Sequence, residues 1–193
     1  MGAPLIPKLS LAGLNLVILI LASGRGERFI ASGGKTHKLD ASFSLDMTVL
    51  EATFHKASQT GLRVHLERGQ HAGMGDTIAA AVAATQDADG WLMLPADMPL
   101  VPPSVMLAVA AELCDSPIVA PQFQGKRGHP VGFSKACMED LLSLTGDQGA
   151  RALFQKFAVK TIDVEALFGA RGCLLDIDTM QDLERLQKHG ILG

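Results

Sequence analysis

The stretch NLVILILASGRGERF, residues 15–29, decides the fold that the sequence predicts. Its residues from Leu16 to Ala22 are all apolar, and they run directly into a loop with two glycines and two arginines. A short apolar run closed by glycines is typical of a buried strand in a parallel sheet, because helices cover both faces of such a sheet. Ligands of open α/β sheets bind beyond the carboxyl ends of the strands. We therefore expect Arg25 and Arg28 to meet phosphate.

The composition favours a globular chain with a small ligand. Of its 193 residues 48% are hydrophobic and 19% charged, which suits a sizeable core. A net charge of −3 offers no general attraction to nucleic acid or to an anionic membrane, so we expect neither as a partner. Cys114, Cys137 and Cys173 lack the spacing of a disulfide framework or a zinc site, which fits a reducing cytoplasm.

The N-terminal segment imitates a secretory signal, because Lys8 precedes an apolar run over residues 9–23 that ends in small residues. Gly13 and Asn15 interrupt this run, which is also shorter than the roughly 20 residues that a membrane span requires. We therefore expect an N-terminal extension over residues 1–14, followed by a single cytoplasmic domain over 15–193.

Strand-like runs alternate with helical patterns along the chain. Strands are predicted near residues 16–22, 62–66, 91–94 and 117–121, with a turn and a strand within 124–134. Helices are predicted near residues 48–58, 76–86, 103–114 and 147–157, and a strand leading into a helix across 174–189. This alternation predicts parallel βαβ units in an α/β fold, and no repeat or low-complexity linker divides it.

The loop GRGERF, residues 24–29, does not match either common phosphate-binding fingerprint. Phe29 occupies the third glycine position of the dinucleotide pattern, and the Gly-Lys-Ser/Thr ending of a Walker loop is absent. The alternative is a tight turn with solvated arginines. Binding is favoured by Asp97, which directly follows another predicted strand and so should lie at the same sheet edge. Mg²⁺ takes one or two carboxylates together with phosphates and water, although an Asp before Met-Pro can also simply form a turn.

Seven motifs, in this order, resemble those of the MobA-like nucleotidyltransferases: LASGRGERF, HKL, GMGDTIAAAV, LPADMPLV, GKRGHPVGFSKAC, GDQGAR and LDIDTMQDL. The resemblance covers about residues 15–189 and, within the family, is strongest to the molybdenum cofactor cytidylyltransferases. It implies a Rossmann-like three-layer α/β/α fold with a mostly parallel sheet, of the nucleotide-diphospho-sugar transferase type. Only about twenty residues separate TVLEAT from GMGDT, roughly half of what the family leads us to expect, which predicts a sheet shorter by one βα unit.

The resemblance also implies a role for each matching residue. The residues expected to line the nucleotide are Leu21, Ala22, Ser23, Gly24, Gly26, Gly73, Gly75 and Thr77. The residues expected to carry catalysis at the triphosphate are Arg25, Arg28, Lys38 and Asp97, with Lys35 as the alternative to Lys38. The residues expected on the acceptor side are His129, Pro130, Asp147 and Arg151. Mg²⁺ is expected on Asp97 and Asp176, because Asp178 is placed beside the cap of the following helix.

The implied reaction is transfer of CMP from CTP to the phosphate of a molybdopterin-type cofactor, with release of pyrophosphate. An acceptor phosphate is largely ionised at neutral pH, since its second pKa is about 6, so no general base is needed. The pair Ala22-Ser23 stands where cytidylyl members have Ala-Ala and guanylyl members Ala-Gly, which leaves GTP as the alternative donor. Transfer to a different phosphorylated metabolite, or a nucleotide-binding cofactor chaperone without turnover, would also fit these motifs. A molybdoenzyme or its chaperone is the expected protein partner.

Overall fold

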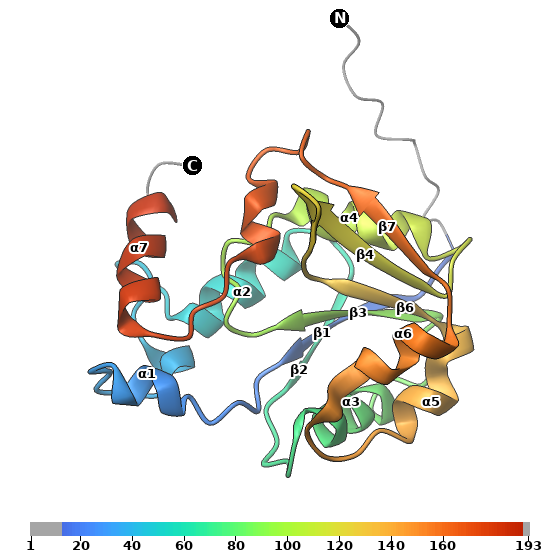
Figure 1. The fold of residues 1–193 in the computed structure, drawn as a ribbon, viewed down its shortest axis with the longest axis horizontal. Coiled ribbons are helices and arrows are strands. Elements are labelled where there is room, and N and C mark those ends of the chain that lie inside the picture. The colour runs from blue at the N-terminus through green and yellow to red at the C-terminus, as the bar shows by residue number, and fades with distance from the viewer. Residues whose placement is uncertain (1–12, 191–193) are drawn as a thin grey trace, which may run out of the picture.

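The central sheet contains seven strands, and most of them run in one direction (Figure 1). The computed structural model describes residues 13–190, so residues 1–12 of the predicted N-terminal extension lie outside the described part of the chain. The strands are β1 (Leu16–Leu21), β2 (Arg63–Glu67), β3 (Gly90–Pro95), β4 (Ile118–Phe123), β5 (Lys126–Arg127), β6 (Val131–Ser134) and β7 (Val159–Asp163). The helices are α1 (Glu27–Ala31), α2 (Val49–Ser58), α3 (Met74–Ala83), α4 (Pro103–Glu112), α5 (Met138–Leu142), α6 (Leu153–Lys156) and α7 (Met180–Gly190).

The strand pairing confirms a mostly parallel sheet. Strand β1 pairs parallel with β2 on one side and with β3 on the other. Strand β6 pairs antiparallel with both β3 and β4, so β4 runs in the direction of β3, and β7 pairs parallel with β4. Only β6 and β5, which is antiparallel to β4, run the opposite way. The α/β fold class is therefore confirmed.

Helices cover both faces of the sheet, as the apolar sequence of β1 predicts. The even-numbered residues of β1 pack with apolar side chains of α2, α4 and α7, and its odd-numbered residues pack with those of α3, α5 and α6. Figure 1 shows α3, α5 and α6 together on one side of the sheet. All six side chains of β1 are buried, and burial of each contributes about 1.5–3 kcal/mol. This two-sided burial fixes β1 in the centre of a three-layer fold and so fixes the loop that follows it.

The last predicted strand is wrong. Residues 175–178 have no regular secondary structure and do not pair with the sheet, and the backbone N–H of Ile177 donates to the carbonyl of Asp97 at 3.0 Å. The seventh strand is instead β7, whose residues are exposed or half-buried and which the sequence reading missed. Residues 174–178 imitate a strand because apolar and acidic residues alternate there with a period of two.

The predicted helices differ from the observed ones mainly in their bounds. Helix α3 begins two residues before the predicted start, and residues 146–152 form a 3-10 segment with a kink at Gly149 (φ 55°) before α6. The short helices α1 and α5 were not predicted. Within residues 13–190, none of the helices has the length and apolar character needed to cross a membrane.

Candidate active site

The parallel register brings the loops after β1, β2 and β3 to one edge of the sheet. Leu21 at the end of β1 is level with Glu67 of β2 and with Pro95 of β3. The backbone N–H of Ala22 donates to the carbonyl of Glu67 at 2.9 Å, and that of Ala96 donates to Leu21 at 3.1 Å. The glycine loop, residues 22–26, therefore lies between the segments that carry Glu67 and Asp97.

Three adjoining hollows open at this edge, and Gly24 borders all of them. The Asp97 hollow, of about 380 Å³, is lined among others by Arg28, Lys38, Asp97, Arg127, His129, Asp176 and Asp178. The Gly24 hollow is lined among others by residues 23–28, Lys38, Gly73 and Asp147. The His71 hollow is lined among others by residues 22–25, His37 and residues 68–72. Together they form a cleft of the size that small-molecule ligands occupy.

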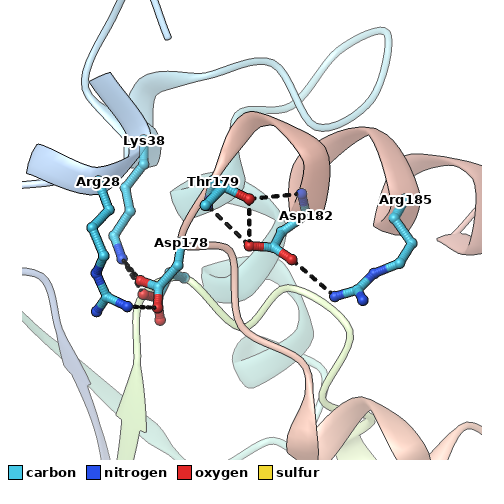
Figure 2. A network of polar contacts seen from close by, with 7 residues as sticks. Arg28, Lys38, Asp178, Thr179, Asp182 and Arg185 are labelled. Carbon is cyan, nitrogen blue, oxygen red and sulfur yellow. Dashed lines mark hydrogen bonds and ion pairs between the residues drawn. The ribbon is translucent and has the colours of Figure 1, made fainter. Parts of the chain in front are cut away.

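Lys38 joins two carboxylates in the Asp97 hollow. Its Nζ donates to Asp97 Oδ2 at 2.5 Å and to Asp178 Oδ1 at 3.2 Å, and Arg28 lies 2.9 Å from the other oxygen of Asp178. Figure 2 shows Arg28 and Lys38 reaching Asp178 from the same side. We call Arg28, Lys38, Asp97 and Asp178 the Lys38 cluster.

The electrostatics of the Lys38 cluster keep the lysine charged. Burial lowers the pKa of Lys38, but the neighbouring carboxylates of Asp97 and Asp178 outweigh burial, and the pKa stands above its ordinary value. Its side chain is only 11% exposed, so solvent screens these contacts little. An ammonium group is thus held at the floor of the cleft.

Asp97 has the features of a metal ligand with one oxygen still available. Its second oxygen, Oδ1, is buried and has no hydrogen-bond partner within the described residues. Burial raises the pKa of nearby Asp176, and the charges of Asp178 and Asp97 raise it further. No group of three or more metal-binding side chains that could cage an ion is found in residues 13–190. Mg²⁺ is usually held by one or two carboxylates with phosphate and water oxygens, so this oxygen-only, incomplete donor set fits it.

His129 closes the Asp97 hollow with a neutral ring. Burial lowers its pKa, and the opposing influences of the Met93 backbone, Asp97 and Asp176 do not reverse this. Its Nδ1 atom is buried without a hydrogen-bond partner in the described residues. A buried polar atom of this kind is costly unless a ligand pairs with it, so His129 stays a candidate acceptor residue.

Of the remaining predicted charged residues, the structure places some at the cleft and one outside it. Arg25 is largely exposed and lies 3.8 Å from Glu27, at the rim of the Gly24 hollow. Asp147 lines the same hollow, whereas the exposed Arg151 does not line any of the three. Arg151 is thus the one predicted charged residue that the structure leaves apart from the cleft.

The GMGDT glycines serve close packing in this structure. A Cβ atom on Gly73 would lie 2.3 Å from the backbone carbon of Gly146, and one on Gly75 would lie 2.7 Å from the Thr145 carbonyl. Further along α3, Thr77 Oγ1 lies 2.5 Å from the hydroxyl of Ser23. The first turn of α3 is therefore fixed against both the 145–147 segment and the glycine loop. The predicted nucleotide contacts of Gly73, Gly75 and Thr77 stay predictions.

The structure shows which of Lys35 and Lys38, and which of Asp176 and Asp178, lies at the cleft. Lys38 is buried in the cleft and Lys35 is exposed outside it. Asp178 lies beside the helix cap as expected, but the inference that it faces away from the cleft is wrong: Thr179 and Asp182 cap α7 through mutual hydrogen bonds, and Asp178 binds Lys38 (Figure 2). Asp176 also lines the Asp97 hollow, so both carboxylates face the cleft.

The sequence analysis assigned no role to His37, Arg127 or His71, which all line the cleft. His37 contacts the Gly24 carbonyl, Arg127 lines the Asp97 hollow, and His71 bonds Glu67 at 3.0 Å between two hollows. Arg127 stands inside a quoted motif, GKRGHPVGFSKAC, and could have been found there. His37 likewise stands inside a quoted motif, HKL, whereas His71 lies outside the quoted motifs and only the fold brings it to the cleft.

Comparison with known families gives one match. Residues 51–162, more than half of the chain, match the model of the MobA-like NTP transferase domain. A search of curated proteins finds no match.

Several solved structures share the fold. Rv0371c from Mycobacterium tuberculosis H37Rv is 25% identical over 91% of this chain and 98% of its own, with a TM-score of 0.73, and it has also been solved in complex with manganese. A nucleotidyl transferase from Methanothermobacter thermautotrophicus is 18% identical over 93% of this chain and 99% of its own, with a TM-score of 0.76. Molybdopterin-guanine dinucleotide biosynthesis protein A from Archaeoglobus fulgidus is 16% identical over 92% and 100%, with a TM-score of 0.68.

Proposed function

Because the chain belongs to the MobA-like NTP transferase family, we propose that it transfers CMP from CTP to the phosphate of a molybdopterin-type cofactor and releases pyrophosphate. The observation that carries the proposal is the Lys38 cluster, which lies beside the glycine loop and includes the unpartnered Asp97 Oδ1. The two cations of the cluster are paired with two carboxylates, so Mg²⁺ bound at Asp97 would supply the net positive charge that two anionic substrates require.

The chemical difficulty of the reaction is charge. An ionised phosphate must approach the α-phosphorus of a triphosphate that carries several negative charges, so catalysis rests on positioning and neutralisation. Lys38 and Arg28 supply positive charge at the junction of the Asp97 and Gly24 hollows, and Arg25 supplies it at the rim. Mg²⁺ held by Asp97, with Asp176 or Asp178 near it, would neutralise phosphate charge when bound.

The acceptor side is assigned to the part of the cleft around His129. The neutral ring of His129 and Arg127 both line the Asp97 hollow, and neither lines the His71 hollow beside the glycine loop. A buried unpartnered Nδ1 can pair with a polar group of a pterin, and Arg127 can pair with its phosphate. The product would then pass to a molybdoenzyme or its chaperone.

Guanylyl transfer from GTP is the second candidate. It is favoured by the likeness in fold to the Archaeoglobus fulgidus protein, which is named for molybdopterin-guanine dinucleotide biosynthesis. CTP is favoured by the motif set as a whole, which resembles the cytidylyl members more than the guanylyl members. A chaperone without turnover would not require the paired Lys38 and Asp97 at the floor of the cleft.

A pyrophosphate-release screen tests the proposal. Each of the four nucleoside triphosphates is offered with molybdopterin or its molybdenum form and Mg²⁺, and wild type is compared with the Asp97→Asn variant. We expect turnover with CTP and a molybdopterin acceptor in the wild type alone. Turnover with GTP only would establish the second candidate. Nucleotide binding without turnover, with every acceptor tried, would favour the chaperone.

A further inference from the structure

His37 holds the glycine loop from outside the Lys38 cluster. Its Nε2 lies 2.7 Å from the carbonyl oxygen of Gly24, and its Nδ1 lies 3.3 Å from the backbone nitrogen of Leu39. The ring also packs on Gly26, where a Cβ atom would lie 3.2 Å from two ring atoms. One imidazole therefore contacts both glycines of the loop.

These contacts give the two ring nitrogens different roles. A backbone N–H can only donate, so Nδ1 of His37 accepts from Leu39, and a carbonyl can only accept, so Nε2 donates to Gly24. Gly26 cannot be replaced without disturbing this contact, because it has a left-handed φ of 67° as well as the short distance to the ring.

No other hydrogen bond within residues 13–190 reaches the backbone of Gly24 or Arg25. In a planar trans peptide the C=O and the following N–H point in opposite directions. With the Gly24 carbonyl on His37, the Arg25 N–H points away from the ring and is left without a protein partner. Arg25 lines both the Gly24 hollow and the His71 hollow, and of these two His37 lines the His71 hollow alone. The contact with His37 thus sets which way the loop presents its amide.

His37 also couples the loop to the Lys38 cluster, because Lys38 is the next residue in the chain. The two side chains diverge: His37 reaches Gly24, and Lys38 reaches Asp97 and Asp178. A single short turn, residues 37–40, thereby fixes the spacing between the loop amides and the buried ammonium group. A group that binds both must match that spacing.

We propose that His37 is a positioning residue for the phosphates of the nucleotide, which acts by orienting the Gly24–Arg25 peptide toward the leaving pyrophosphate. This inference rests on the proposed function only in that the glycine loop binds the pyrophosphate part of the substrate. It holds for any nucleobase and any acceptor. Its test therefore uses inorganic pyrophosphate, which has neither.

The experiment compares three variants of His37 with the wild type and with His55→Ala, an exposed histidine on α2 that serves as control. His37→Ala removes both hydrogen bonds. His37→Asn keeps a short acceptor for the Leu39 N–H and lacks the reach to Gly24. His37→Gln has an amide that reaches as far as Nε2 and can donate to Gly24. Affinity for pyrophosphate with Mg²⁺ is measured by titration calorimetry, and kcat and KM are measured for CTP and for the acceptor.

We expect His37→Ala and His37→Asn to bind pyrophosphate about 2- to 12-fold more weakly, the range for one hydrogen bond, and to raise KM for CTP alike. His37→Gln should recover most of the affinity. The kcat and the KM for the acceptor should stay close to wild type in all three His37 variants. The control His55→Ala should match the wild type in every measurement. Wild-type affinity in His37→Asn would overturn the proposal, because the contact with Gly24 would then have no effect and His37 would serve only to accept the Leu39 N–H. Unchanged affinity in His37→Ala would overturn it as well.

The pattern of failure separates the two proposals. If pyrophosphate binding depends on His37 and the CTP screen shows no turnover, the positioning role stands and the substrates of the proposed function are wrong. If the wild type does not bind pyrophosphate with Mg²⁺, the loop is not a phosphate site and both proposals fall. Thermal unfolding of each variant identifies a loss of affinity that comes from misfolding, and His37→Gln and His37→Asn then carry the comparison.

Discussion

Replacement of Asp97 by asparagine removes one negative charge from the Lys38 cluster and preserves the shape of the side chain. A hydrogen bond to a charged group is worth about 1.5–3 kcal/mol, and the Lys38 and Asp97 side chains are only 11% and 16% exposed. Lys38 keeps its contact with Asp178 at 3.2 Å, and the raised pKa of Asp176 is relieved by the loss of a nearby charge. We therefore expect a net cost of about 1–2 kcal/mol in unfolding free energy, which lowers Tm by about 2–8 °C.

The effect of Asp97→Asn on turnover should be much larger than its effect on stability. Loss of a charge-stabilising group in an active site costs at least about 10²-fold in rate, and Asp97→Ala should be as inactive. The assay is pyrophosphate release at saturating CTP and Mg²⁺, well below the Tm of the variant. Asp87→Asn is the matched control, because Asp87 does not line the cleft and forms an ion pair with Arg63 at 2.7 Å in which the two side chains are 63% and 44% exposed. Such a pair contributes about 0–1 kcal/mol. Near-normal turnover in either Asp97 variant would show that Asp97 is not the metal ligand.

Three further predictions concern the cleft. Ser23→Gly should raise the use of GTP relative to CTP by roughly 10- to 200-fold at most, measured as the ratio of kcat/KM values with one acceptor, and an unchanged ratio would remove Ser23 from the base pocket. Gly73→Ala should lower the unfolding free energy by about 1–3 kcal/mol, because its Cβ would meet Gly146 at 2.3 Å; an unchanged Tm would contradict this. Lys38→Met should abolish turnover while Lys35→Met should not, and equal loss would refute the assignment. Because the folded-state pKa of Lys38 is raised, its stabilisation is present below pH 10.5 and is lost as pH rises above that value, so the stability difference between wild type and Lys38→Met should shrink there.

The strand and loop at the start of the domain could be predicted because local and global preferences agree there. The side chains of β1 are buried on both faces, so every one of them is apolar, and the glycines that follow end the run. Helix α2 could be predicted equally well, since Thr48 and Glu51 form a complete capping box at its start. These elements are the ones whose sequence pattern has a single structural explanation.

The segment before α7 could not be predicted because its pattern has two explanations. Alternation of apolar and acidic residues suits a strand, but it also suits a chain that crosses the cleft with Ile177 in the core and carboxylates toward the ligand. The sequence contains a pattern that predicts the orientation of Asp178, but the sequence analysis did not use it. Thr179 and Asp182 have the spacing of a capping box, and a helix capped in that way leaves the preceding Asp178 free.

The hydrogen bonds around Ser23 limit what this residue can contribute to the choice of base. The hydroxyl of Thr77 donates to the carbonyl of Gly73 at 2.9 Å, so the proton shared between Ser23 and Thr77 comes from Ser23. Ser23 then has only lone pairs to offer to a ligand. A nucleobase placed against it would need an N–H donor, which cytosine offers as an amino group, guanine as an amino group or N1–H, and uracil as N3–H. Hydrogen bonding to Ser23 therefore does not by itself exclude any of these bases. Ser23 can separate CTP from GTP only by size, which is why the Ser23→Gly substitution is expected to shift that ratio without reversing it.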